Sequence, residues 1–173
     1  APSTLDDVWN RHIADSLQLY QIQPDAGIWL DLGSGGGFPG MITAIRLIEK
    51  SAGWVHLVES NQKKAAFLRV ALQEIGARGT VHCLRIEDAR NLIPDPDFIS
   101  ARALTDMSGL LDYSWLWMQD RPHMRLYFHK GRDYQSEIDK ASSLWDFDLV
   151  KHHSVTAPDS VILEVSRLRR LAV

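Results

Sequence analysis

The stretch that decides the expected fold is residues 28–40, which read Ile28-Trp-Leu-Asp-Leu-Gly-Ser-Gly-Gly-Gly-Phe-Pro-Gly40. Its first five residues form a short apolar run of the length of a buried strand. The glycines that follow allow the backbone to adopt positive φ values and to approach a ligand closely. Pro39 suits the first turn of a helix over residues 39–50, because its fixed φ is helical. The stretch therefore predicts a strand, a glycine-rich loop and a helix N-terminus that favours a carboxylate or phosphate.

Strand-length apolar runs alternate with amphipathic helical segments along the rest of the chain, which is typical of a mostly parallel sheet covered by helices. The further strands are expected over residues 54–58, 80–85, 98–101, 124–128, 149–154 and 161–165, and the helices over 5–19, 39–50, 61–76, 107–118 and 134–145. We predict one α/β domain over residues 1–173, with a doubly wound, Rossmann-like, mostly parallel seven-stranded sheet and helices on both faces. Residues 1–22 form its N-terminal helical segment. Because the chain begins at Ala1 and not at a methionine, we expect this segment to be truncated upstream.

The composition, with 45% hydrophobic residues in a chain of 173, indicates an ordinary globular protein with one sizeable core. No apolar run reaches the roughly 18–20 residues of a membrane-spanning helix, and no signal peptide is visible. The single cysteine, Cys83, excludes an intrachain disulfide, and no cysteine cluster indicates a metal site. We expect a cytoplasmic protein without a metal.

The net charge of -3 argues against a protein that coats nucleic acid by bulk electrostatics. A local basic face is nevertheless enough to bind RNA. Three groups of basic residues are either such a face or ordinary solvated surface. They are Lys63, Lys64 and Arg69; Lys130 and Arg132; and Arg167, Arg169 and Arg170.

The glycine spacing separates two classes of nucleotide-binding protein. The dinucleotide-binding fingerprint requires a glycine three residues after its second glycine. Counted from Gly35, that position is Phe38, so the dehydrogenase pattern fails. The spacing of Gly33, Gly35 and Gly37 after Asp31 instead resembles the cofactor loop of class I methyltransferases. Loops of this kind also serve purely as tight turns, so their neighbours decide between the two interpretations.

Two acidic positions supply that context. Glu59 follows the strand over 54–58, where a carboxylate meets the ribose of a nucleotide in doubly wound folds. The alternative is that Glu59 only caps the helix that begins near Asn61. Ile86 and Glu87 follow the third strand and are candidates to pack on and read an adenine, although they also fit a solvated turn.

The tip of the fourth strand, residues 99–103, is where the reactive end of such a cofactor is expected. It carries neither the Asn/Asp-Pro-Pro-aromatic motif of amino-group methyltransferases nor a nucleophilic cysteine. Both absences favour an acceptor that is already nucleophilic, such as guanine N7, which carries no proton and needs no general base. Arg102 is a candidate to hold the cofactor carboxylate or guanine O6, or else forms a structural ion pair.

Near the N-terminus, His12, Asp15 and Ser16 are spaced three and four residues apart and so share one helical face. With Arg102 they are the candidate catalytic residues, in positioning roles. A polar cluster of this kind is otherwise an exposed surface.

These segments together resemble the bacterial ribosomal RNA small-subunit methyltransferase G family, also called the glucose-inhibited division protein B family. The similarity covers about residues 9–131 and is carried, in order, by Arg11-His-Ile-Ala-Asp-Ser16, Asp31-Leu-Gly-Ser-Gly-Gly-Gly-Phe-Pro-Gly40, Val58-Glu-Ser60, Lys63-Lys-Ala-Ala-Phe-Leu-Arg69, Arg85-Ile-Glu87, Ser100-Ala-Arg-Ala103 and Lys130-Gly131.

The resemblance implies a class I methyltransferase fold and transfer of a methyl group from S-adenosylmethionine to guanine N7 in 16S ribosomal RNA. It also implies cofactor contacts by Gly33, Phe38, Ile86, Glu87 and Arg102. The residues expected to face the cleft or the RNA are Arg11, His12, Asp15, Ser16, Lys63, Lys64, Lys130 and Arg132. We expect a monomer that acts on the small ribosomal subunit. Two alternatives remain open: a class I methyltransferase of a small molecule or protein, and a non-catalytic nucleotide-binding factor in ribosome assembly.

Overall fold

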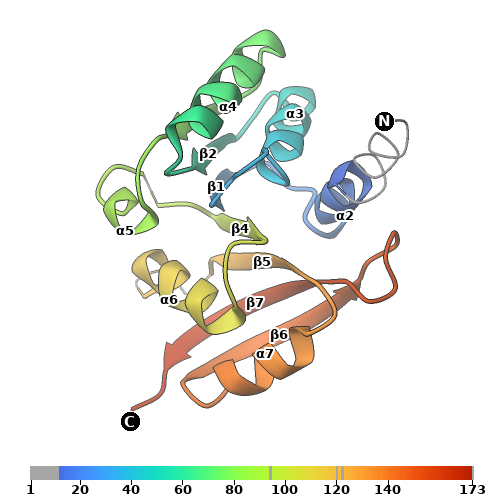
Figure 1. The fold of residues 1–173 in the computed structure, drawn as a ribbon, viewed down its shortest axis with the longest axis vertical. Coiled ribbons are helices and arrows are strands. Elements are labelled where there is room, and N and C mark those ends of the chain that lie inside the picture. Colours follow the sequence, from blue (N-terminus) through green and yellow to red (C-terminus); the bar gives the residue numbers. More distant parts are fainter. Residues whose placement is uncertain (1–11, 94, 120, 122, 173) are drawn as a thin grey trace.

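A computed structural model describes residues 12–93, 95–119, 121 and 123–172. Seven strands form one sheet in the order β3-β2-β1-β4-β5-β7-β6 (Figure 1). The strands are β1 (Ile28–Leu32), β2 (Trp54–Val58), β3 (Gly79–His82), β4 (Phe98–Arg102), β5 (Arg125–Lys130), β6 (Trp145–His153) and β7 (Val161–Arg170). The first five run parallel, and β7 is antiparallel to both β5 and β6. The predicted α/β class with a mostly parallel seven-stranded sheet is confirmed.

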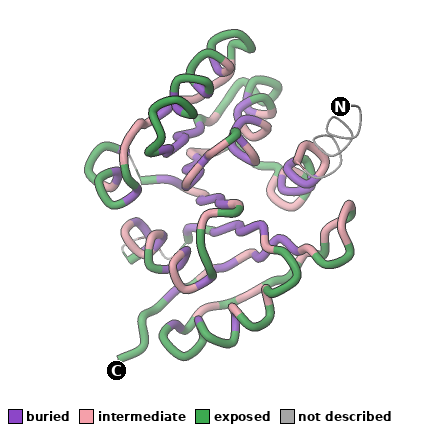
Figure 2. The backbone as a smooth tube through the Cα atoms, viewed as in Figure 1, coloured by how far each residue is buried: buried purple, intermediate pink, exposed green. Residues whose placement is uncertain are grey.

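The helices cover both faces of this sheet (Figure 1). They are α2 (Ala14–Ile22), α3 (Gly40–Lys50), α4 (Gln62–Glu74), α5 (Ile86–Ala89), α6 (Met107–Met118) and α7 (Tyr134–Ala141). Side chains of α2, α3 and α4 pack with Trp29 on one face, whereas those of α5, α6 and α7 pack with Leu30 and Leu32 on the other. Adjacent strand residues point to opposite faces, so β1 contributes to both cores, and Figure 2 shows buried residues along the central strands.

Several helices and strands begin or end at other residues than the sequence predicted. The third strand ends at His82, and not at residue 85, because residues 86–89 turn into the short helix α5. The helix predicted over 134–145 ends at Ala141, because buried Trp145 begins β6 and pairs with Arg170. Of the helix predicted over 5–19, residues 5–11 lie outside the described part of the chain, and α2 continues to Ile22.

The register of the sheet brings the site together. Leu32 of β1 pairs with Val58 of β2 and with Ala101 of β4. The parallel strands therefore end at one edge, and the glycine loop, Glu59 and Arg102 meet there, as expected in doubly wound folds. Asn61 caps α4 as predicted, because its Oδ1 accepts the N–H groups of residues 63 and 64 at 3.0 and 3.1 Å.

Among the helices that the structure describes, none is both long enough and apolar enough to cross a membrane.

Candidate functional site

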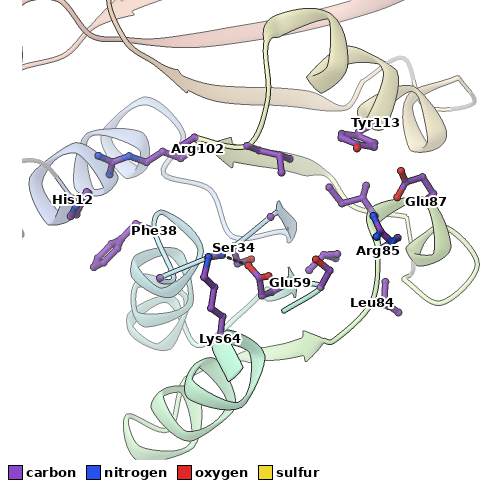
Figure 3. Close-up of a pocket in the computed structure, with 18 residues that line it drawn as sticks. His12, Ser34, Phe38, Glu59, Lys64, Leu84, Arg85, Glu87, Arg102 and Tyr113 are labelled. Carbon is purple, nitrogen blue, oxygen red and sulfur yellow. Dashed lines mark hydrogen bonds between the residues drawn. The ribbon is translucent and has the colours of Figure 1, made fainter. Parts of the chain in front are cut away.

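A cavity of about 730 Å³ opens at the carboxyl edge of the parallel strands (Figure 3). Its lining comes from the ends of β1, β2 and β4, from the segment before and within α5, and from α6. The volume lies within the range of about 300–1,000 Å³ that is usual for small-molecule sites.

The glycine loop forms the floor of this cavity. Gly33, Gly35 and Gly37 all have positive φ values, of 63°, 53° and 97°. A Cβ on Gly35 would lie 3.7 Å from its nearest neighbour, the carbonyl oxygen of Gly33, and a Cβ on Gly36 would meet no atom within 4 Å. Both positions thus open into the cavity, where the missing side chains leave room for a ligand to approach the backbone.

Two predicted cofactor residues support the loop from beneath instead of lining the cavity. A Cβ on Gly37 would lie 2.5 Å from Met41 Cγ, so this glycine permits close packing of α3. Asp31 is only 1% exposed, and its Oδ1 accepts a hydrogen bond from Ser100 Oγ at 2.6 Å. Burial raises the pKa of Asp31 to about 6, against the opposing hydrogen bonds from Ser100 and Ser34. Neither residue lines the cavity, and both support the loop; their predicted part in cofactor binding stays a prediction.

Glu59 stands at the centre of the cavity lining. Its Oε2 accepts the N–H of Gly35 at 2.8 Å, and its Oε1 accepts the N–H of Asn61 at 2.7 Å. The carboxylate thus ties the loop to the start of α4, which the capping interpretation anticipated. An ionised carboxylate has about four lone-pair positions, so capacity remains to accept hydroxyl groups of a ribose.

One end of the cavity combines apolar and charged side chains. Figure 3 shows Leu84, Arg85, Glu87 and Tyr113 at this end, and Ile86 also lines it. Ile86 begins α5 and is 8% exposed. The sequence pointed to residues 86 and 87, whereas Tyr113 lies on α6 and no motif indicated it.

The opposite end carries positive charge and aromatic rings. Arg102, His12 and Phe38 lie together in Figure 3, and the rings of His12 and Phe38 stack with their centroids 5.4 Å apart. Burial lowers the pKa of Arg102, an effect that the negative charge of Asp15 partly offsets. Ala103, which belongs to the strand tip where the reactive end of the cofactor was expected, also lines the cavity, as does Leu104, which no motif indicated.

The other two residues of the predicted N-terminal cluster lie elsewhere. Asp15 lines a second, adjoining cavity, which it shares with His12 and Arg102. Ser16 is 2% exposed and donates to the carbonyl oxygen of His12 at 2.5 Å, so it stabilises the start of α2 and lines neither cavity.

The predicted RNA-binding residues occupy different environments. Lys64 lines the first cavity, Arg132 lines the second, and Lys63 is exposed on α4. Lys130 lines neither: its Nζ lies 2.9 Å from the carbonyl oxygen of Thr105 and 2.5 Å from a carboxylate oxygen of Glu137. Arg11 lies outside the described residues. Within the described part of the chain, no group of three or more His, Cys, Asp or Glu side chains is placed to hold a metal ion.

The sequence matches a known family. The family described as rRNA small subunit methyltransferase G matches residues 1–164. The chain is 63% identical over 171 residues to the ribosomal RNA small subunit methyltransferase G of Rhizobium johnstonii. This match covers 99% of this chain and 83% of that protein. It is 65% identical over 171 residues to the protein of that name from Sinorhizobium medicae, with 98% of this chain and 80% of that protein covered.

Solved structures with low sequence identity share the fold. A fibrillarin/Nop5p complex matches with a TM-score of 0.68 at 14% identity, over 91% of this chain and 82% of that one. The ribosomal protein L11 methylase of Lactobacillus delbrueckii matches with a TM-score of 0.63 at 17% identity, over 89% of this chain and 77% of that one. A variant of the protein MtNAS in complex with S-adenosylmethionine matches with a TM-score of 0.66 at 13% identity, over 88% of this chain and 62% of that one.

Proposed function

Because the chain belongs to the rRNA small subunit methyltransferase G family, it is an S-adenosylmethionine-dependent methyltransferase of 16S ribosomal RNA, and we propose that the cavity at the carboxyl edge of its sheet binds the methyl donor and presents it to N7 of a guanine. The observation that carries this proposal is the position of Glu59, hydrogen-bonded to the loop at Gly35 and lying between two chemically different ends of one cavity.

The two ends fit the two halves of S-adenosylmethionine. The end with Ile86 and Tyr113 suits the adenine ring, and the exposed carboxylate of Glu87 there is an acceptor for polar groups on the edge of the ring. Glu59 suits the ribose hydroxyl groups. The end with Arg102 suits the amino-acid part, because a guanidinium binds a carboxylate with paired hydrogen bonds.

The bound cofactor supplies an electrophilic methyl group on its sulfonium. The protein then has to hold the acceptor nitrogen in line with that methyl group, and such positioning is a large share of catalysis in bimolecular displacements. Arg102 lines both cavities and so reaches the acceptor side, where its N–H groups match guanine O6. No general base is assigned, because guanine N7 carries no proton. Phe38 and Leu104 reduce the access of water to the reacting end.

The remaining parts of the proposal concern partners and location. We propose that the protein acts as a monomer on the small ribosomal subunit or its RNA, in the cytoplasm where these subunits are assembled. Lys64, at the cavity rim on α4, and exposed Lys63 beside it are proposed to contact the RNA backbone, since phosphate contacts dominate affinity for RNA.

A labelled-methyl assay tests the function. Purified protein, labelled S-adenosylmethionine and small subunits from cells that lack the modification should give label in the 16S RNA, and mass spectrometry of the digested RNA should find it as 7-methylguanosine. Arg102→Ala should lose transfer. The matched control is Arg125→Ala, because Arg125 begins β5 at the opposite edge of the sheet and pairs with Glu164.

Label in a different nucleotide would contradict the guanine N7 assignment. Transfer only to small molecules or protein, or cofactor binding without any transfer, would contradict the proposed substrate.

A further inference from the structure

A second cavity, of about 650 Å³, adjoins the proposed cofactor cavity. His12 and Arg102 line both, so the two spaces meet at the end where the reactive methyl group is proposed to lie. The other walls of the second cavity are Asp15, the segment that follows β5 at residues 132–133, and the β6–β7 loop at residues 156–160. The proposed function so far assigns no occupant to this second cavity.

The β6–β7 loop is held against α2 by side chains that the first cavity does not use, and Figure 1 shows the loop beside that helix. Asp15 is 7% exposed, and its Oδ1 accepts hydrogen bonds from Ser154 Oγ at 2.8 Å and from Thr156 Oγ1 at 3.4 Å. Buried charge-assisted hydrogen bonds of this kind are stronger than neutral ones. The far wall of the second cavity is therefore fixed to α2, the helix that follows His12.

A second side chain of α2 holds the same loop. Gln18, also 7% exposed, donates from Nε2 to the carbonyl oxygen of His153 at 2.7 Å and accepts the N–H of Val155 at 3.0 Å. Both polar ends of this amide are thus used on the backbone of the β6–β7 connection. Such doubly anchored loops are preorganised, which lowers the entropic cost of binding a ligand.

The lining has the chemistry of a guanine site. Arg102 provides N–H donors, which match the O6 acceptor of guanine. The loop provides acceptors, the Asp159 carboxylate and the hydroxyl groups of Thr156 and Ser160, which match the N1–H and N2–H₂ donors on the Watson–Crick edge. An adenine would present the opposite pattern at the equivalent positions. Arg132 at the rim lies 3.2 Å from Asp159 and is 81% exposed, where a phosphate can reach it.

We propose that the second cavity holds the flipped-out guanine nucleotide that accepts the methyl group, with the β6–β7 loop as its specificity wall and Asp15 as the positioning residue of that loop. Enzymes that modify a base take it out of the stack into a pocket, and the volume is within the usual range for a ligand of this size. This inference rests on the proposed function, because it names the site of the same substrate.

The first test places a large side chain in the second cavity by a substitution in the β6–β7 loop. Ala157→Trp places an indole in the cavity from a position that lines it. The matched control is Val155→Trp, because residue 155 lies on the same loop, is 76% exposed and does not line the cavity. For each protein we would measure S-adenosylmethionine affinity by calorimetry, RNA affinity, and the single-turnover rate of methyl transfer at saturating RNA.

We expect Ala157→Trp to keep its cofactor affinity and to lose about 100-fold or more in single-turnover rate, the usual cost of displacing a reacting group by about 1 Å. Val155→Trp should transfer at the wild-type rate. An unchanged rate in Ala157→Trp at saturating RNA, with or without weaker RNA affinity, overturns the inference, since the cavity then holds no reacting nucleotide. Failure of the wild-type protein to methylate RNA would instead overturn the proposed function itself.

A second variant tests the loop anchor. Asp15→Asn keeps the size of the side chain but weakens its acceptor for Ser154 and Thr156. We expect a lower single-turnover rate with unchanged cofactor affinity, and a larger relative rate on RNA whose target guanine is replaced by inosine, which lacks N2–H₂. An unchanged ratio between guanine and inosine RNA in this variant would contradict the role of Asp15 in positioning the specificity wall.

Discussion

Glu59 Oε2 accepts the backbone N–H of Gly35 at 2.8 Å, so the side chain that follows β2 is joined to the glycine loop that follows β1. The other oxygen of the same carboxylate accepts the N–H of Asn61 at 2.7 Å. The side chain that we propose to bind the ribose therefore also shapes the loop on which the cofactor rests.

Glu59→Gln should weaken cofactor binding. The amide has one acceptor oxygen in place of two, so one of the two N–H groups now faces an NH₂ group. Hydrogen bonds to a charged group contribute about 1.5–3 kcal/mol each. The neutral amide offers the ribose hydroxyl groups a weaker acceptor with fewer lone pairs, so we expect S-adenosylmethionine affinity to fall at least tenfold in calorimetry. Thermal unfolding of the unliganded protein serves as the control for a general folding defect. An affinity within twofold of wild type in a folded variant would contradict the ribose assignment.

Gly35→Val should abolish cofactor binding, because the branched side chain would project into the cavity that Gly35 lines. The matched control is Gly76→Val, since Gly76 has a φ of 60°, close to the 53° of Gly35, and open space around its Cβ position, but lies after α4 and outside the cavity lining. Both variants carry backbone strain of about 1–3 kcal/mol. Equal loss of affinity in both would mean that strain, and not occupancy of the cavity, is responsible.

His56 and His82 should make the protein less stable in acid. Their ring nitrogens Nδ1 and Nε2 lie 2.9 Å apart, and burial, together with the neighbouring His82, lowers the pKa of His56 to about 4. In the unfolded chain this pKa returns to about 6.5. The unfolded state therefore binds more protons in this window, and stability that is complete above about pH 6.5 is lost as the pH falls towards about 4.

Urea unfolding at pH 7 and at about pH 4.5 checks this sign. We expect His56→Gln to lose less stability between the two pH values than the wild-type protein. The raised pKa of Asp31 acts in the opposite direction but is common to both proteins, so it cancels in the comparison. An equal loss in both proteins would contradict the assignment to His56.

The fold was predictable because local pattern and global topology agree. The glycine loop after β1 and the N-cap at Asn61 are signalled by residue types whose backbone preferences are strong, and the structure has both where the sequence placed them. The end of β3 was harder to predict, because residues 83–85 are as compatible with a strand as with the loop that leads into α5.

The site was predictable where its residues follow strand ends, and not where tertiary packing places them. Gly33, Glu59 and Arg102 each end or follow a parallel strand, so topology alone brings them to one edge. Tyr113 enters the cavity from the middle of α6, which no local pattern specifies. Conversely, Asp31 belongs to the motif but is buried beneath the loop, where it accepts a hydrogen bond from Ser100. This contact depends on the pairing of β1 with β4.

Arg132→Gln and Lys130→Gln should show which of these two cations contacts RNA and which one stabilises the fold. Arg132 is 81% exposed at the rim of the second cavity. Its exposed ion pair with Asp159 contributes little to stability, so an RNA phosphate can take the place of Asp159 as the partner of Arg132. Lys130 has a side chain only 9% exposed and lies 2.5 Å from Glu137, whose carboxylate also accepts the N–H of Met107 at the start of α6.

We expect Arg132→Gln to lower the slope of log affinity for RNA against log salt by about 1 in magnitude, with unchanged stability. Lys130→Gln should keep that slope but lower the free energy of unfolding by about 1–3 kcal/mol, because the Glu137 carboxylate, 23% exposed, loses its charged partner. Binding titrations at several salt concentrations, with urea unfolding of each variant, measure both quantities. A reduced slope for Lys130→Gln, with stability unchanged, would instead place Lys130 on the RNA, as its motif alone suggested.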